Sequence, residues 1–204
     1  MNLRRPPLRV GVSGSVGAGK TTLIAALCER LRDRYEVAVV ANDRDGQEDA
    51  GQLLRMGTLV RDRIVGIDAG GCSHAPVGHD VCLNLAAVEA LLARHERLQV
   101  IFIEGDRTTG DGTFHPLLAD LSIHVIDIAA GEKASRRGDP SIAQSDLLVI
   151  NKTDLAAAVG VSLMNVERDT VSVRQGRPHV FTSLRQGDGP DLVCAFVIEH
   201  GMLD

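Results

Sequence analysis

The sequence predicts an α/β fold in which helices cover both faces of a mostly parallel sheet. Short runs that are apolar throughout alternate with longer segments in which apolar residues recur at helical spacing. Strands that are buried on both faces read as continuous apolar runs, so this alternation is typical of a parallel sheet between two layers of helices. The chain has 204 residues, which suits a single domain over 1–204.

The elements can be placed one by one along the chain. Strands are predicted over residues 8–12, 37–41, 64–67, 100–103, 125–128, 147–150 and 180–181. Helices are predicted over 48–56, 83–95, 161–174 and 191–200, and an earlier helix carries Leu23, Ile24, Leu27 and Leu31 at helical spacing. Ligands of such sheets bind outside the carboxyl ends of the strands, so polar residues that follow strands are candidate site residues.

The composition narrows the function classes. The net charge is -5 and no broad basic stripe is visible, which argues against nucleic acid as a partner. No apolar run approaches the length of about eighteen residues that crosses a bilayer, so no membrane partner is expected either. We expect a cytoplasmic protein in which Cys28 and Cys194 are small core residues rather than disulfide partners.

The first predicted strand runs into a glycine-rich stretch that leads into the first predicted helix. The stretch is Gly14-Ser15-Val16-Gly17-Ala18-Gly19-Lys20-Thr21, and Thr22 comes next. It fits G-x-x-x-x-G-K-[ST], in which backbone N–H groups at a helix N-terminus cradle phosphates. Lys20 is expected to reach the β- and γ-phosphates, and the Thr21 hydroxyl to ligate Mg²⁺. Strand, glycine loop and helix in this order predict a P-loop NTPase whose residues 14–22 contact the nucleotide.

A second element predicts which base is bound. Asn151-Lys152-Thr153-Asp154 directly follows the predicted strand 147–150 and matches the N-K-x-D element by which GTPases recognise guanine. The Asp154 carboxylate can accept two parallel N–H bonds from the N1 and N2 edge of guanine, a pair of donors that adenine lacks. Asn151 and the stem of Lys152 would brace the loop and flank the base. The loop that closes over the base is predicted at Thr182-Ser183-Leu184, so the nucleotide is predicted to be GTP.

Two carboxylates follow predicted strands at the edge where the phosphates should lie. Asp43 comes after strand 37–41, and Glu104 after strand 100–103. Mg²⁺ prefers hard oxygen ligands, so either side chain could hold the ion through water, or orient the water that attacks the γ-phosphate. The catalytic residues are therefore predicted to be Lys20, Asp43 and Glu104, and the magnesium ligands Thr21, Asp43 and Glu104. Asp127 is interpreted as structural.

Taken together, these residues resemble the UreG urease accessory GTPases, nickel metallochaperones related to the hydrogenase-maturation GTPases. The similarity covers most of the chain, and residues 145–155 (Ser-Asp-Leu-Leu-Val-Ile-Asn-Lys-Thr-Asp-Leu) follow the family pattern without a break. Other matching stretches are 17–21, 42–43 with 48–49, 63–66, 70–72 with 74, 84–89 and 125–127. The resemblance implies a slow GTPase that forms a homodimer on binding GTP and metal. It also implies that the dimer holds Ni²⁺ between its subunits, and that GTP hydrolysis releases the ion to apo-urease, with other urease accessory proteins as partners.

By this resemblance, Cys72 and His74 occupy the outer positions of the family's Cys-Pro-His nickel motif, with Ser73 in place of the proline. Thiolate and imidazole suit Ni²⁺, and two subunits would together supply the four donors of a square-planar site. His79 and Cys82 extend the pattern to C-x-H-x4-H-x2-C, which could hold Zn²⁺ tetrahedrally within one subunit. The favoured interpretation instead leaves His79 exposed in a loop and turns Cys82 toward the core.

Two stretches depart from the family pattern where the γ-phosphate should be sensed. Residues 44–47 are Arg-Asp-Gly-Gln, and residues 105–109 are Gly-Asp-Arg-Thr-Thr. Asp106 would repel a phosphate, whereas Arg107 could compensate for that charge or act as a positive finger in its own subunit. These departures, and the extra donors His79 and Cys82, leave two alternatives to a nickel metallochaperone open. One is a GTP-dependent switch or binding module with weak hydrolysis, and the other is a paralogue that handles another metal such as zinc.

Overall fold

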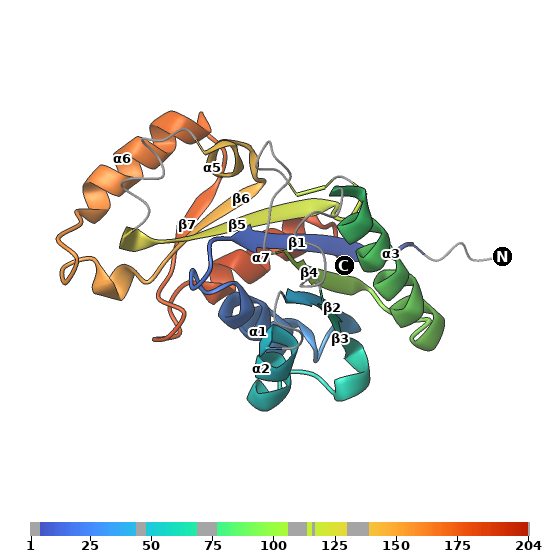
Figure 1. The fold of residues 1–204 in the computed structure, drawn as a ribbon. Coiled ribbons are helices and arrows are strands. Elements are labelled where there is room, and N and C mark those ends of the chain that lie inside the picture. Colours follow the sequence, from blue (N-terminus) through green and yellow to red (C-terminus); the bar gives the residue numbers. More distant parts are fainter. Residues whose placement is uncertain are drawn as a thin grey trace.

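The computed structural model describes residues 5–43, 48–68, 77–105, 114–115, 117–129 and 139–203. Within them, seven strands form one sheet in the order β3-β2-β4-β1-β5-β6-β7, and each pair of neighbouring strands is parallel (Figure 1). The strands are β1 (Leu8–Gly14), β2 (Val37–Asp43), β3 (Ile64–Asp68), β4 (Val100–Glu104), β5 (Leu121–Asp127), β6 (Leu147–Asn151) and β7 (His179–Phe181). The fold class predicted from the sequence is confirmed.

Helices cover both faces of the sheet. One face carries α1 (Lys20–Leu31), α2 (Glu48–Met56) and α7 (Pro190–His200). The other carries α3 (Val77–Arg94) over β2 and β4, and α5 (Pro140–Gln144) with α6 (Leu163–Arg174) over β5 and β6 (Figure 1). Two 3₁₀ turns lie at Arg61–Arg63 and Thr153–Leu155. In β2, Val39 packs into the first layer and Val40 into the second, which is why this strand is apolar throughout.

Strand β5 is longer than the apolar pattern predicts. It begins at Leu121 rather than at residue 125, because Ser122 and His124 interrupt the apolar run but are still built into the strand. Both polar side chains find partners on other strands or loops. The Ser122 hydroxyl donates to Asp146 Oδ2 at 2.7 Å, and His124 pairs with Ser13 of β1. These partners satisfy the polar groups that a buried strand would otherwise leave without hydrogen bonds.

Helix boundaries also differ from the expectation. Helix α3 begins at Val77, not at residue 83, and α5 was not predicted. The start of α5 nonetheless carries a local signal, because the Asp139 carboxylate caps it by accepting from Ser141 N at 2.9 Å and Pro140 occupies the first turn. Among the described residues, no helix has both the length and the apolar character needed to span a membrane.

A buried arginine joins the amino ends of β6 and β7. Arg174 closes α6 with 1% of its surface exposed. Its guanidinium donates to the carbonyl oxygens of Ser145 at 2.9 Å and Pro178 at 2.7 Å, and also to that of Ile142. Burial, with the nearby charge of Arg177, lowers the pKa of Arg174 to about 10, so the side chain stays charged at pH 7. The edge of the sheet opposite to the carboxyl ends is therefore tied by charge-assisted hydrogen bonds.

Candidate functional site

The carboxyl ends of the strands bring the predicted site residues to one edge of the sheet. Strand β4 lies beside β1, so Glu104 at the end of β4 is next to the glycine loop that follows β1. Asn151 ends β6, in register with Asp127 of β5. Asp43 ends β2 opposite Asp68 of β3, and its side chain lies outside the described part of the chain. The backbone thus places each of these strand ends where a ligand of a parallel sheet binds.

Two positions of the glycine loop accept no side chain. Gly14 has a φ of 149°, and a Cβ there would lie 2.1 Å from the carbonyl oxygen of Val125. Gly19 caps α1 with a left-handed φ of 105°, and a Cβ there would lie 2.4 Å from the side-chain nitrogen Nδ2 of Asn151. Glycine is required at both places, by the backbone angle and by the close approach of neighbouring atoms. The positions of these two glycines in the motif therefore follow from how tightly the loop packs against β5 and β6.

Lys20 opens α1 and lies within the curl of the glycine loop, with 7% of its surface exposed. Its Nζ donates to the carbonyl oxygens of Gly14 at 3.2 Å and Ser15 at 3.4 Å. No acidic residue stands in the first turn of α1, so the positive end of the helix dipole and the lysine charge act at the same place. This combination suits an anion, and a phosphate group in particular.

Oxygen atoms from three helices and strands gather around the Thr21 hydroxyl. Thr21 Oγ1 lies 2.8 Å from Glu104 Oε1 and 3.0 Å from Asp49 Oδ1. Glu104 is 1% exposed, and Asp49 stands in the first turn of α2. A hydroxyl and two carboxylates are hard oxygen donors, and this set fits a divalent cation such as Mg²⁺. Asp49 belongs to the stretch 48–49 that matches the family pattern, but it was not predicted as a site residue; an acidic pair that opens a helix soon after a strand end is the signal for it.

Asn151 ties the glycine loop to the loop at 182–184. Its side-chain amide donates to the carbonyl oxygen of Ala18 at 2.9 Å. Its Oδ1 accepts from the backbone N–H of Leu184 at 3.2 Å and from the Thr182 hydroxyl at 3.1 Å. Asn151, Ala18 and Thr182 are all buried, so these bonds are shielded from competing water. Three stretches that the sequence analysis selected separately are therefore in direct contact.

The Asp154 carboxylate is also held in place. Ser183 Oγ donates to Asp154 Oδ1 at 2.7 Å, from the loop on the other side of the expected base site. The preceding turn is tight, because Lys152 adopts a left-handed φ of 64°. Lys152 Nζ lies 3.9 Å from Asp127 Oδ2, so Asp127, which was interpreted from sequence as structural, stands beside the N-K-x-D turn.

Directly before the glycine loop, Ser13 pairs with a histidine to which the sequence analysis gave no role. Ser13 Oγ lies 2.9 Å from Nδ1 of His124, which is 6% exposed. Burial lowers the pKa of His124 to about 4, and the charges of Arg174 and Lys20 lower it as well, whereas Asp139 opposes them. His124 is therefore neutral at pH 7 and adds no positive charge beneath the loop.

The structure corrects the interpretation of two predicted metal donors. His79 lies within α3 rather than in a loop, and Cys82 is exposed on that helix instead of facing the core. Val81, Val88 and Leu91 form the buried face of α3, and Cys82 lies off that face. Cys72 and His74 fall outside the described residues, as do 44–47 and 106–109. Among the residues that are described, no group of three or more His, Cys, Asp and Glu side chains could hold a metal ion.

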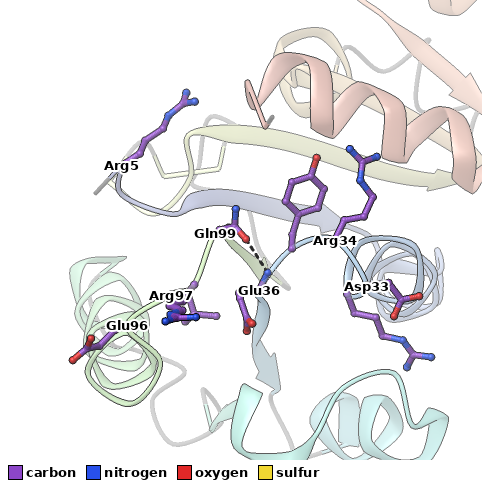
Figure 2. A pocket seen from close by; sticks show the side chains of 10 residues that line it. Arg5, Asp33, Arg34, Glu36, Glu96, Arg97 and Gln99 are labelled. Atoms are coloured by element: carbon purple, nitrogen blue, oxygen red, sulfur yellow. Dashed lines mark hydrogen bonds between the residues drawn. The ribbon is translucent and has the colours of Figure 1, made fainter. Parts of the chain in front are cut away.

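A cavity of about 610 Å³ lies at the opposite edge, near the amino ends of β2 and β4 (Figure 2). Charged residues of both signs line it, including Arg34, Arg97 and Glu36. Another lining residue, Arg32, donates to the carbonyl oxygen of Thr58 at 2.9 Å. These residues come from connections between elements rather than from the carboxyl ends of strands. The edge that carries the glycine loop remains the candidate site.

Known proteins resemble this chain in sequence and in fold. The sequence model of the family described as "CobW/HypB/UreG, nucleotide-binding domain" matches residues 8–181. The hydrogenase maturation factor HypB from Archaeoglobus fulgidus superposes with a TM-score of 0.75 at 20% identity, over 97% of this chain and 91% of that one. HypB from Helicobacter pylori, solved in complex with nickel, gives 0.73 at 19% identity, over 95% and 86%. A LAO/AO transport system kinase gives 0.61 at 21% identity, over 99% of this chain and 61% of that one. At these identities the likeness to solved structures establishes the fold.

Proposed function

Because the chain belongs to the CobW/HypB/UreG family of nucleotide-binding domains, we propose that it is a GTPase that loads and releases a metal ion. In this proposal a single domain, residues 1–204, binds GTP with Mg²⁺ and hydrolyses it slowly. The metal is the cargo, and hydrolysis times its release.

The observation that carries the choice of GTP is the contact between the two loops expected to surround the base. Ser183 holds one oxygen of Asp154, and Asn151 joins the same region to the glycine loop. A carboxylate fixed in this way is ready to accept the two N–H donors of guanine without first losing side-chain freedom. Lys20 and the backbone N–H groups of 14–22 would bind the phosphates.

The oxygen cluster around Thr21 is the proposed magnesium site. Thr21, Glu104 and Asp49 would hold the ion, and Asp43 at the end of β2 would reach it through water. The ion would neutralise charge on the β- and γ-phosphate oxygens. Lys20 would stabilise the same oxygens, and Glu104 or Asp43 would orient the attacking water.

Nickel is the proposed cargo, bound by Cys72 and His74 across a homodimer. The client is apo-urease, served in the cytoplasm together with other urease accessory proteins. Support comes from the UreG-like run at 145–155 and from the preference of Ni²⁺ for thiolate and imidazole donors. The HypB structure from Helicobacter pylori, which has the same fold, contains nickel. This part of the proposal rests on sequence, since Cys72 and His74 lie outside the described residues.

The exposure of Cys82 favours one alternative cargo. A thiol on the outside of α3 is accessible to a metal held by the preceding segment, which keeps the zinc set Cys72, His74, His79 and Cys82 open. In that case the same GTPase cycle would serve a zinc-dependent client.

The base assignment is tested by exchanging the group that reads guanine. Asp154→Ala should lower the affinity for GTP by at least about tenfold, since one charged hydrogen-bonding contact is worth about 1.5–3 kcal/mol. Asp154→Asn replaces an acceptor by an amide and should move the preference from GTP toward XTP, whose C2 carries an oxygen. Asp33→Ala, an exposed change at the opposite edge, is the matched control. Unchanged GTP affinity in Asp154→Ala would show that this turn does not read the base.

The cargo is tested by measuring GTP hydrolysis and dimer mass with Ni²⁺, with Zn²⁺ and without metal. Nickel should promote the dimer in the presence of GTP, and Cys72→Ala should abolish this effect while leaving GTP affinity unchanged. Cys82→Ala separates the two sets of ligands, because only the zinc site uses that thiol. If neither metal alters the dimer or the hydrolysis rate, the metallochaperone proposal is wrong and a nucleotide-dependent switch remains.

A further inference from the structure

We infer that Asn42 and Asn84 form a positioning pair that links the oxygen cluster around Thr21 to helix α3. Asn42 is the penultimate residue of β2, and Asn84 lies in α3. The inference rests on the proposed function, in which the oxygen cluster holds Mg²⁺ beside the γ-phosphate. It adds a route by which the state of the nucleotide reaches a distant helix.

The two amides bind each other reciprocally. Asn42 Nδ2 donates to Asn84 Oδ1 at 2.9 Å, and Asn84 Nδ2 donates to Asn42 Oδ1 at 3.0 Å. Asn84 is 3% exposed, so the pair is shielded from competing water on the helix side. Paired hydrogen bonds between two planar amides are directional, and a shift of either partner weakens both bonds at once.

Asn42 also reaches the candidate site directly. Its Nδ2 donates to the carbonyl oxygen of Glu104 at 2.6 Å, so both amide protons of Asn42 are used. The carboxylate of the same Glu104 accepts from Thr21 at the start of α1. One continuous series of hydrogen bonds therefore runs from the helix that follows the glycine loop, through Glu104 and Asn42, to α3.

The apolar contacts of α3 with the sheet, among residues whose side chains are described, are of a different kind. Val81, Val88 and Leu91 pack on the apolar face formed by β2 and β4. Apolar packing has little directional preference, so it tolerates small sliding movements of the helix. Between residues 81 and 94, where the side chains of α3 are described, Asn84 is the buried polar residue. The amide pair is therefore a directional contact that favours one position of α3 relative to the ends of β2 and β4.

This position has a consequence for the proposed cargo site. Helix α3 begins at Val77, three residues after His74 in the sequence. A rearrangement of Glu104 when the γ-phosphate is lost would alter the bond from Asn42, and with it the preferred position of α3. Asn42 and Asn84 are thus positioning residues, which act through Glu104 and α3 rather than by touching nucleotide or metal.

The test compares Asn84→Leu and the double variant Asn42→Leu/Asn84→Leu with the wild type. Leucine has nearly the shape of asparagine, and the double variant leaves neither amide without its partner, so it remains informative if the single variant fails to fold. Asn165→Leu, an exposed change on α6, is the matched control. Thermal unfolding checks that each variant is folded.

The first readout is hydrogen exchange of the α3 backbone with Mg²⁺ and either GDP or a non-hydrolysable GTP analogue. In the wild type and Asn165→Leu, exchange rates over residues 81–94 should differ between the two nucleotides. In the Asn variants this difference should shrink to less than about twofold. The affinity for the GTP analogue should stay within about threefold, since Asn42 bonds to the backbone carbonyl of Glu104 and the carboxylate keeps its bond with Thr21.

The second readout is the ratio of Ni²⁺ affinities in the two nucleotide states. Coupled sites typically show ratios of about 5 to 150, and the Asn variants should bring the ratio close to one. A folded double variant that keeps the wild-type exchange difference and the wild-type ratio would overturn the inference. A wild-type protein that binds GTP but not nickel would instead refute the proposed cargo, and the exchange measurement would still decide the role of the pair.

Discussion

Asn151 offers the sharpest test of how the candidate site is assembled. Its side chain holds the carbonyl of Ala18, the backbone N–H of Leu184 and the hydroxyl of Thr182 at distances of 2.9, 3.2 and 3.1 Å. Asn151→Ala removes all three bonds at once. Asn151→Asp keeps oxygens for Leu184 and Thr182 but places a carboxylate against the Ala18 carbonyl, so it breaks the bond to the glycine loop alone.

The stability cost of these variants follows from how deeply the partners of Asn151 are buried. Ala18, Thr182 and Leu184 are 0%, 1% and 9% exposed, so Asn151→Ala leaves three polar groups with little access to water. Each buried polar group that loses its partner lowers the free energy of unfolding by about 1–3 kcal/mol. Water that enters the vacated space offsets part of this cost, so we expect Asn151→Ala to lower the free energy of unfolding by about 3 kcal/mol in total. For a chain of this size that lowers the Tm by about 6–12 °C. Asn151→Asp should lose about half as much stability.

Urea unfolding followed by circular dichroism measures the stability, and a fluorescent GDP measures nucleotide affinity. Both variants should bind nucleotide at least about tenfold more weakly, since each frees the glycine loop from β6. Asn165→Ala on the exposed side of α6 is the control and should stay within about 0.5 kcal/mol of the wild type. If Asn151→Ala also stays within that range, the three contacts do not hold the loops together and the reasoning is refuted.

Three further predictions concern the surroundings of the site. Because the pKa of His124 is lowered from 6.5 to about 4, the unfolded chain binds a proton between these values that the folded protein does not. Stability should therefore fall by about 2 kcal/mol from pH 7 to pH 5, and His124→Gln should reduce this slope in urea unfolding. Arg174→Met should cost about 3 kcal/mol by leaving buried carbonyls at the amino ends of β6 and β7 without donors, with nucleotide affinity unchanged. Gly14→Ala places a Cβ 2.1 Å from the carbonyl oxygen of Val125 and should cost about 3 kcal/mol. Gly17→Ala meets nothing within 4 Å and should cost only about 1–2 kcal/mol, from its left-handed φ of 76°.

Local features of the sequence were sufficient for the fold class. All seven strands were predicted, because strands buried on both faces are apolar throughout and stand out from their surroundings. The glycine loop was recognisable because the backbone angles of Gly14 and Gly19 demand glycine at fixed spacing. The edge of the sheet at which these residues meet follows from parallel topology alone.

Two details failed, one because it depends on partners distant in the chain and the other because a helix boundary was misplaced. Ser122 and His124 break an apolar pattern, and only Asp146 and Ser13 make them compatible with a buried strand. Cys82 was assigned to the core because its helix was expected to start six residues later than it does. An error in where a helix begins hides the residues that define its buried face.

By itself, the sequence determined a parallel α/β fold of the nucleotide-binding kind and predicted a turn that reads guanine, since each signal is encoded in a short run of residues. Only the tertiary structure decided that Asn151 holds a loop 133 positions away, that Asp49 joins Glu104 at Thr21, and that Asn42 and Asn84 connect this cluster to α3. The reason is physical. A hydrogen bond depends on the positions of two groups, and when these are far apart in the chain the packing of the whole sheet decides whether they meet.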